Sequence, residues 1–311
     1  MREHPRTMFA NAYGKFGIAA FNVFTAEQIH GVFAGVAAVG TPVIVQITPA
    51  ARRYMTPEML QGMIGSAERI YPEARIAVHL DHGDTAHCMH AIEAGSYDSV
   101  MIDASHEPFE KNIALTKAVV DRAHERGMMV EAELGVLSGV EDEMAVGADH
   151  ARYTDPDQAA EFVGRTGCDS LAIAIGTSHG AYKFRGAMAL NLDVLSRIQK
   201  ALPGFPLVLH GASAVPHEEI ARINASGGDL KTDSRGIAIE ELRNAIRHGV
   251  VKVNIATDMR LLWTRVCREF FRTSPDQFDP VVPGKRYMEA LQELVAMRCS
   301  ELAVSNGHGK G

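Results

Sequence analysis

The amino-acid sequence predicts an α/β protein, a single (β/α)8 TIM barrel with extended active-site loops and a C-terminal helix. Eight short segments rich in Val, Ile, Leu and Ala alternate along the chain with longer amphipathic stretches. Such nearly continuous apolar segments are typical of parallel strands that are buried on both faces. No glycine-rich dinucleotide-binding motif follows the first segment, which disfavours a doubly wound open sheet, the alternative architecture.

The apolar segments and the stretches between them give an expected element for each βα unit of the barrel. Strands are expected at residues 18–23, 43–47, 76–80, 99–102, 129–134, 171–175, 207–209 and 251–255. Helices are expected at 26–38, 57–70, 85–94, 112–126, 156–165, 192–201, 237–247 and 259–271, with a final helix over 287–304. Two longer connections, 135–155 and 214–235, each follow a strand, so they belong to the active-site face as lids or substrate walls.

Length and composition limit the class of protein. The chain has 311 residues and 46% hydrophobic content, so we expect one barrel domain over 1–304 and a disordered tail over 305–311. The net charge of −7 argues against a nucleic-acid partner, and no apolar run is long enough to span a membrane. Four cysteines without paired spacing and a polar N-terminus without a signal peptide predict a cytoplasmic protein with reduced thiols.

Three of the expected strands end in a histidine that precedes a glycine. These histidines are His82, His179 and His210. A barrel gathers the carboxyl ends of its strands around one point, and three imidazoles with an open position are typical of a catalytic zinc site. One histidine at a strand end is more often a hydrogen-bonded polar group, but three in equivalent places favour a metal. His79 is interpreted as barrel packing or as a partner of a metal ligand.

Four carboxylates also follow strand ends or lie in the first long loop. Asp81 is expected within reach of a metal-bound substrate, or alternatively as a hydrogen-bond partner of a ligand imidazole. Asp103 and Glu133 end neighbouring strands, where they could hold a second cation or cap the neighbouring helices. Glu141 could swing into the site with its loop and exchange a proton, or it could belong to a solvated acidic loop.

Small residues that expose the backbone follow three of the strands. They are Gly180, the tripeptide Gly211-Ala212-Ser213, and residues 254–257, where Asn254-Ile255-Ala256-Thr257 ends the last strand. Barrels commonly bind phosphate at the loops after their seventh and eighth strands, near a helix N-terminus. The sequence therefore predicts a phosphate site beside the metal site.

With these motifs the chain resembles the class II, zinc-dependent ketose-bisphosphate aldolases of the fructose-bisphosphate and tagatose-bisphosphate type. The resemblance extends over roughly residues 22–297 and is carried by residues 79–83, 98–103, 130–135, 176–180, 209–213 and 252–257. It implies a carbon–carbon lyase of carbohydrate metabolism and glycolysis. Such an enzyme cleaves a ketose bisphosphate, foremost fructose 1,6-bisphosphate, reversibly to dihydroxyacetone phosphate and an aldehyde such as glyceraldehyde 3-phosphate.

The resemblance also implies roles for particular residues. His82, His179 and His210 bind Zn2+, which stabilises the enediolate, while Asp103 and Glu133 match residues that can hold a second divalent cation. Asp81 removes the C4 hydroxyl proton and Glu141 exchanges the proton at C3. The positions expected to bind substrate are Asn22, Thr48, Gly180, Gly211, Ala212, Ser213, Asn254, Ile255, Ala256, Thr257 and Arg260. A monovalent cation, Na+ or K+, can assist, and a homodimer or homotetramer is expected.

Some positions depart from the fructose-bisphosphate pattern. Ala256 replaces an aspartate and, like Thr48, is similar to tagatose-type enzymes, whereas Arg260 is similar to fructose-type enzymes. Val281 replaces the arginine that helps to hold the distal phosphate, and such a charge-assisted contact contributes about 1.5–3 kcal/mol. Either Lys285 or Arg286 replaces it, or the substrate is a tagatose bisphosphate or another ketose 1-phosphate with a different aldehyde part.

Two alternatives to an aldolase come from other classes of protein. One is a non-catalytic protein that binds sugar phosphate, and the other is a metal-dependent hydrolase on the same barrel. The three histidines together with Asp81 and Glu141 argue against the first, and the phosphate loops argue against the second.

Overall fold

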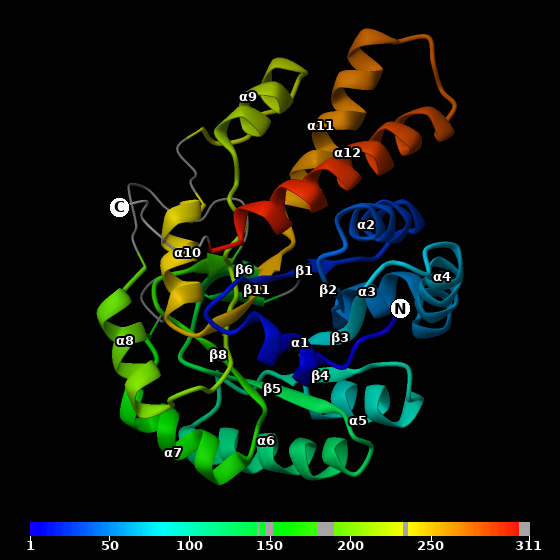
Figure 1. Cartoon of the computed structure of the whole chain (residues 1–311). Helices are drawn as coiled ribbons and strands as arrows, with labels where there is room; N and C mark the ends of the chain where they lie inside the picture. The colour runs from blue at the N-terminus through cyan, green and yellow to red at the C-terminus, as the bar shows by residue number, and fades with distance from the viewer. Residues whose placement is uncertain (142–143, 147–151, 180–189, 233–235, 305–311) are drawn as a thin grey trace, which may run out of the picture.

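Eight parallel strands close into a barrel in the computed structural model, which describes residues 1–141, 144–146, 152–179, 190–232 and 236–304. Of residues 138–141, 144–146 and 179 only the backbone is described. The barrel strands are β1 (Ile18–Asn22), β2 (Val43–Ile47), β3 (Ile76–Gly83), β4 (Ser99–Ile102), β5 (Met129–Leu134), β8 (Ser170–Ile173), β10 (Leu207–Leu209) and β11 (Val250–Ile255). They pair in the order β1–β11–β10–β8–β5–β4–β3–β2, which confirms the predicted TIM barrel (Figure 1).

Helices surround the barrel and cover the outward apolar faces of its strands. The predicted helices are present as α2 (Ala26–Val39), α4 (Pro57–Ile70), α5 (Thr85–Ala94), α6 (Phe109–His124), α7 (Pro156–Thr166), α8 (Leu192–Ala201), α10 (Ile239–Arg247), α11 (Thr257–Thr273) and α12 (Val281–Glu301). Three short helices were not predicted: α1 (Pro5–Ala12), α3 (Pro49–Met55) and α9 (His217–Ala225). The last of these lies within the segment 214–235, which had been expected to be a loop.

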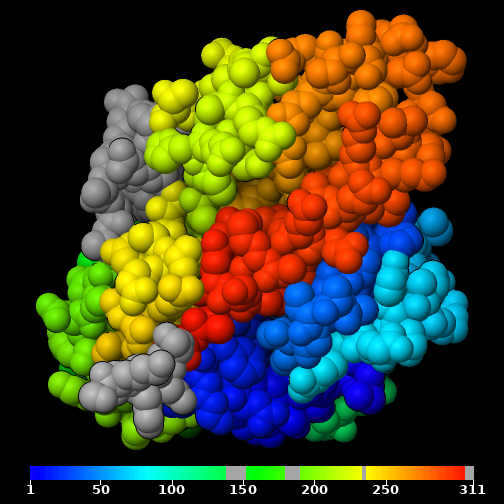
Figure 2. Space-filling view, turned by 45° about the horizontal axis from the view of Figure 1, so that its top comes forward, coloured from blue at the N-terminus to red at the C-terminus, as the bar shows by residue number. Residues whose placement is uncertain are grey.

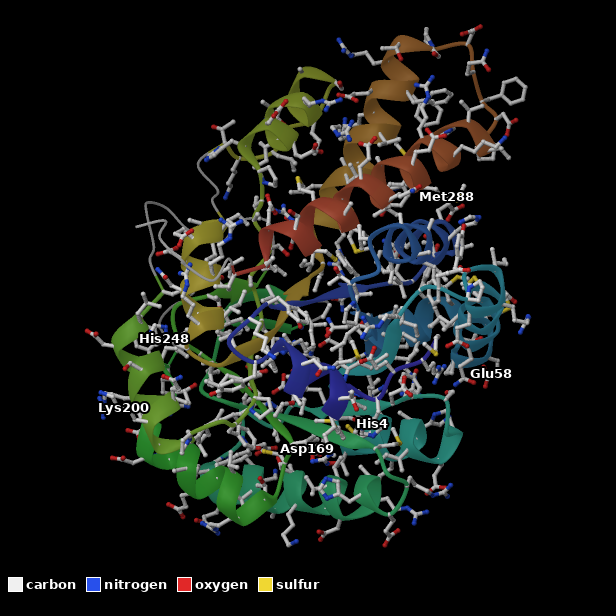
Figure 3. The ribbon with its side chains drawn as sticks, viewed as in Figure 1. His4, Glu58, Asp169, Lys200, His248 and Met288 are labelled. Atoms are coloured by element: carbon white, nitrogen blue, oxygen red, sulfur yellow. The ribbon has the colours of Figure 1, made fainter. Side chains whose placement is uncertain are left out.

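Helix α1 closes the end of the barrel at which the strands begin. Met8, Phe9 and Ala12 form a buried cluster with early strand residues such as Ile18 and Val251. The closure is fixed by polar contacts at its rim, where Arg6 Nη2 lies 2.8 Å from Asp169 Oδ1. Figure 3 labels His4 at the start of α1 and Asp169 on the same side of the barrel. The opposite end, where the strands finish, is therefore the end at which the site residues collect.

The C-terminal helix packs on α2 through glycine. A Cβ atom at Gly31 would lie 2.8 Å from Leu291 Cβ, and one at Gly35 would lie 2.7 Å from Val295 Cβ. The two helix axes approach closely because neither glycine carries a side chain. Figure 2 shows α12 in red between α2 in blue and α10 in yellow, and Figure 3 labels Met288 where α12 faces α2.

A second, small sheet lies within the first long loop. Strand β6 (Ser138–Glu141) pairs antiparallel with β7 (Met144–Val146) and parallel with β9 (Ser178–His179). The predicted loop 135–155 thus contains two strands and pairs with the segment that carries His179. The predicted tail, 305–311, lies outside the described residues. None of the described helices combines the length and the apolar character that a membrane crossing requires.

Candidate metal centre and active site

The end of β3 places Asp81 and His82 on the same side, although they are adjacent in sequence. In a regular strand, neighbouring side chains point to opposite faces. Here the pairing with β4 shifts between Leu80 and Gly83, and His82 has a left-handed backbone with φ of 49°. This bulge lets ligand atoms of Asp81 and His82 both lie within 4.8 Å of His210, which follows β10.

His82 and His210 each place one ring nitrogen on a carboxylate and turn the other ring nitrogen toward the neighbouring histidine. His82 Nδ1 lies 2.9 Å from Asp103 Oδ2, and His210 Nε2 lies 2.8 Å from Glu131 Oε1. Each carboxylate accepts an N–H, so His82 Nε2 and His210 Nδ1 are the nitrogens that carry lone pairs. Those two nitrogens are 2.8 Å apart. Asn254 Nδ2 also lies 3.0 Å from His210 Nδ1, where it can donate a hydrogen bond. Two facing lone pairs repel each other, and a cation coordinated by both removes the repulsion, so this pair fits a metal ion.

Asp81 is fully buried and is surrounded by amide donors. It accepts hydrogen bonds from Asn22 Nδ2 at 2.7 Å, Gln46 Nε2 at 3.4 Å and Asn254 Nδ2 at 3.2 Å. These donors come from β1, β2 and β11, so three strands fix the carboxylate beside the histidines. Among the described residues, Asp81 makes no hydrogen bond to a ligand imidazole, the contact that its second interpretation requires.

Gln46 is a site residue that the sequence interpretation missed. Its side chain is fully buried, and Nε2 also donates to Asn22 Oδ1 at 3.1 Å. A signal was present, because Gln46 is the one polar residue in the otherwise apolar strand β2. A buried amide in an apolar strand requires polar partners, and here those partners are site residues.

Asp103 and Glu133 approach the other side of the His82 ring. The ligand atoms of the three residues lie within 4.8 Å of one another, with Glu133 Oε2 3.8 Å from His82 Nδ1. Burial alone would raise the pKa of Asp103, but the hydrogen bonds that it accepts from His82 and Ser105 hold the pKa well below its usual range. Ser105 N and Oγ donate to Asp103 Oδ1 at 3.1 and 2.8 Å. Asp103 therefore orients the His82 ring and caps the loop after β4, whereas helix α6 begins at Phe109 with Pro108 as its N-cap, so Asp103 does not cap that helix.

A buried charge network continues from the metal centre into the barrel. Lys252 Nζ lies 2.7 Å from Glu131 Oε2 and 3.3 Å from His79 Nε2, and all three side chains are at most 2% exposed. Burial opposes ionisation of Glu131, but the Lys252 charge and the His210 hydrogen bond lower its pKa. For His79, burial followed by the Lys252 charge lowers the pKa, which favours the neutral ring. The interpretation of His79 as interior packing near a ligand agrees with these contacts.

The segment after β10 has a backbone that requires glycine. Gly211 has φ of 60°, and a Cβ atom there would lie 2.5 Å from the Ser178 carbonyl oxygen. Ser213 Oγ accepts from Ala256 N at 3.3 Å, so this segment lies against the start of α11. No side chain caps the N-terminus of α11, which begins at Thr257. The predicted phosphate residues thus meet where backbone N–H groups and the helix dipole favour an anion.

The remaining predicted substrate residues lie at nearby strand ends. Asn254 and Ile255 end β11, and Thr48 follows β2, where its side chain accepts from Ala51 N as the N-cap of α3. Arg260 is exposed on the first turns of α11, with its guanidinium 5.8 Å from the centre of the Phe24 ring. Ala212 is buried, so only its backbone is available to a ligand.

Two predicted residues are described only by their backbone. Glu141 ends β6 and His179 ends β9, and the pairing of Gly139 with His179 brings these two strands together. Their side chains, and Gly180, lie outside the described residues. The structure thus groups His82, His210, Asp81, Asp103 and Glu133 directly and brings the two segments that carry Glu141 and His179 side by side.

A closed (β/α)8 barrel with imidazoles and carboxylates gathered at its strand ends defines an enzyme with a candidate metal centre. The family model described as "Fructose-bisphosphate aldolase class-II" matches residues 3–308. Proteins named fructose-bisphosphate aldolase from Giardia intestinalis and Treponema pallidum are each 41% identical to this chain. The alignments cover 94% and 88% of this chain, and 90% and 88% of those proteins.

Solved structures agree with the sequence comparisons. The crystal structure of the YdjI aldolase from Escherichia coli K12 matches with a TM-score of 0.77 and 31% identity, over 97% of each chain. The chain belongs to the class II fructose-bisphosphate aldolase family, and it is an aldolase, a carbon–carbon lyase.

Proposed function

We propose that this aldolase cleaves fructose 1,6-bisphosphate to dihydroxyacetone phosphate and glyceraldehyde 3-phosphate, reversibly and with a catalytic Zn2+. The observation that carries the proposal is the pair of facing nitrogens, His82 Nε2 and His210 Nδ1, 2.8 Å apart beside the buried Asp81 carboxylate. A metal held there would be adjacent to the Asp81 carboxylate, which accepts hydrogen bonds from three side-chain amides.

His82, His210 and His179 are the proposed zinc ligands. When bound, zinc acts as a Lewis acid that polarises the substrate carbonyl and stabilises the negative charge developing next to it. Asp103 and Glu133, which lie on the far side of His82, are proposed to hold a second divalent cation. A monovalent cation, Na+ or K+, is proposed to assist binding at the phosphate site.

The proton transfers are assigned to two carboxylates. Asp81 takes the proton of the C4 hydroxyl as the C3–C4 bond breaks, so the aldehyde forms and the bonding electron pair stays on the three-carbon fragment. The amides of Asn22, Gln46 and Asn254 hold Asp81 in place for this step. Glu141 then supplies the proton at C3, a role supported by the pairing of its strand with the His179 segment.

The phosphate of the three-carbon fragment is assigned to the segment after β10 and the start of α11. Gly180, Gly211 and Ser213 supply N–H or hydroxyl donors, as do Asn254 and Thr257. Backbone groups come from Ala212, Ile255 and Ala256. The neighbouring strand ends are lined by Thr48 and Asn22. The close approach of Gly211 to the Ser178 backbone supports this assignment, because it brings two of the glycine-containing segments together.

The distal end of the substrate is assigned to Arg260, which lies beside Phe24 at the end of β1. Arg286 is a weaker candidate because its guanidinium stacks over Phe270, at 5.1 Å, near the end of α11 that is away from the proposed phosphate site. Lys285 is exposed in the first turns of α12. A second candidate function, cleavage of tagatose 1,6-bisphosphate or a ketose 1-phosphate with another aldehyde part, is favoured by Val281 and Ala256 in place of charged residues.

The test is to measure kcat/KM for release of dihydroxyacetone phosphate from fructose 1,6-bisphosphate, tagatose 1,6-bisphosphate and fructose 1-phosphate, with and without a chelator. We expect a chelator-sensitive preference for fructose 1,6-bisphosphate and its loss in Asp81→Asn. Arg260→Ala should lower kcat/KM for the bisphosphate about 10–150-fold, with little effect on fructose 1-phosphate. Equal, weak activity on all three substrates would exclude the primary assignment, and activity that survives chelation would exclude the metal.

The assembly and setting of the enzyme are part of the same proposal. We propose one catalytic domain over residues 1–304, assembled as a homodimer or homotetramer in the cytoplasm. Sedimentation of the purified chain and fractionation of its source cells test these two statements.

A further inference from the structure

Arg298, near the end of α12, is a buried arginine that reaches the start of α11. Its residue exposure is 4%, and its Nη2 lies 3.0 Å from Asp258 Oδ2, whose side chain is 2% exposed. A second contact joins Arg298 Nη1 to the carboxylate of Glu301, which is partly exposed. A charged side chain is rarely buried this far from water unless it stabilises an opposite charge.

Asp258 in turn holds the segment that follows the proposed phosphate residues. Its Oδ1 accepts from Val215 N at 2.9 Å, and its Oδ2 accepts from Ala214 N at 3.1 Å. These two residues come directly after Gly211-Ala212-Ser213. Both carboxylate oxygens are therefore engaged by the segment, and one of them also faces Arg298.

The segment needs this support because its backbone is strained. Val215 has φ of 45°, a left-handed conformation that is unfavourable for a β-branched residue. The two hydrogen bonds that Ala214 N and Val215 N donate to Asp258 hold the chain in that conformation. Gly236 packs against the same segment, since a Cβ atom there would lie 2.2 Å from the Ser213 carbonyl oxygen. The position of Ser213 thus depends on contacts made outside the site.

We propose that Arg298 is a positioning residue for phosphate binding, acting from the C-terminal helix through Asp258 on the segment after β10. The buried guanidinium balances the Asp258 charge, so the carboxylate stays in place and keeps Ala214 and Val215, and with them Ser213, in the geometry that binds a phosphate. The ligand class is the phosphate monoester of the three-carbon fragment. This inference rests on the proposed function for the location of that phosphate.

The test compares Arg298→Met and Arg298→Lys with Glu301→Gln, which removes only the outer partner of the same arginine. For each variant we would measure the inhibition constant of inorganic phosphate, the KM for dihydroxyacetone phosphate in the condensation direction, kcat, and the dissociation constant for zinc. Arg298→Met should raise both the inhibition constant of inorganic phosphate and the KM for dihydroxyacetone phosphate about tenfold or more, with little change in zinc affinity. Arg298→Lys should restore part of the loss, and Glu301→Gln should resemble the unmodified enzyme.

Two results would overturn the inference. One is unchanged phosphate inhibition and KM in Arg298→Met. The other is a parallel loss of zinc and phosphate binding that Lys does not relieve, which would mean a general structural role. If Arg298→Met does not fold, the neutral and polar Arg298→Gln variant decides, because phosphate inhibition equal to that of Glu301→Gln would contradict the proposal. Failure of the proposed function appears separately, as absence of cleavage by the unmodified enzyme. In that case binding of inorganic phosphate to the unmodified enzyme and to Arg298→Met can still be compared by calorimetry.

Discussion

Glu131 links the metal centre to the barrel interior. It lies 2.8 Å from His210 Nε2 and 2.7 Å from Lys252 Nζ, and none of these side chains is more than 2% exposed. The carboxylate fixes which His210 nitrogen carries the proton, and the lysine fixes the carboxylate. The orientation of His210, one of the proposed metal ligands, therefore depends on the Glu131–Lys252 charge pair.

Replacing Glu131 with Gln should weaken zinc binding about 10–100-fold, because the neutral amide holds His210 less firmly and leaves Lys252 without its counter-charge. Chelator competition on the purified protein measures the change. The matched control is Glu107→Gln, a partly exposed glutamate that pairs with Lys111 on the surface. An unchanged zinc affinity in a folded Glu131→Gln protein would show that His210 is oriented without the carboxylate.

At this scale the sequence predicted site residues better than it predicted their geometry. The positions of Asp81, His82 and His210 agree with a common site because each follows a strand end, and strand ends can be read from apolar patterns. The bulge at His82 could not be predicted, since it depends on the register between β3 and β4. Gln46 was missed because one amide in an apolar strand gives no motif.

Among the helices, the contact between α2 and α12 depends on the absence of two side chains. Gly31 and Gly35 lie one helical turn apart on α2 and face Leu291 and Val295 on α12. The glycines lower the helix propensity of α2, and the close packing offsets that cost. The C-terminal helix, which carries Arg298, is thereby anchored to the first βα unit of the barrel.

Gly35→Ala should destabilise the fold by about 1–3 kcal/mol, because the new Cβ would lie 2.7 Å from Val295 Cβ and 3.1 Å from the Gln292 carbonyl oxygen. Urea unfolding measures the change. The control is Gly62→Ala on α4, where a Cβ meets no atom within 4 Å, so we expect stabilisation of about 0.5–1 kcal/mol. The idea of tight α2–α12 packing fails if Gly35→Ala is as stable as Gly62→Ala.

Long, periodic elements were predictable, and short ones were not. The eight strands lie within three residues of their predicted bounds because both of their faces are buried. Helix α3 has a start signal in Thr48 and Pro49, but it has only seven residues, too few for a periodic pattern. Strands β6 and β9 were also missed, because their pairing joins segments far apart in the sequence.

For the molecule as a whole, the proposed metal centre joins residues from opposite parts of the barrel. His82 lies near the end of β3 and His210 follows β10, strands that are not neighbours in the barrel. A cation between their rings therefore cross-links the folded state and has no equivalent in the unfolded chain.

Zinc should raise the thermal stability of the protein, and chelation should lower it. At free zinc of 1,000 times its Kd, the expected gain is about 4.1 kcal/mol. Calorimetry of the zinc-loaded and the chelated protein measures this gain in stability. In His82→Ala the difference in stability between the two forms should be smaller. Identical transitions with and without zinc in the unmodified protein would contradict a cross-linking metal.

The closure of the barrel by α1 has a consequence for the order of catalysis. Since Met8 and Phe9 seal the end where the strands begin, both products must leave by the end that holds the metal centre. The three-carbon product is the one proposed to be retained by the metal and the phosphate residues, while the aldehyde is bound at the outer, Arg260 side. On this proposal we expect the aldehyde to be the first product to depart and, in synthesis, the second substrate to bind.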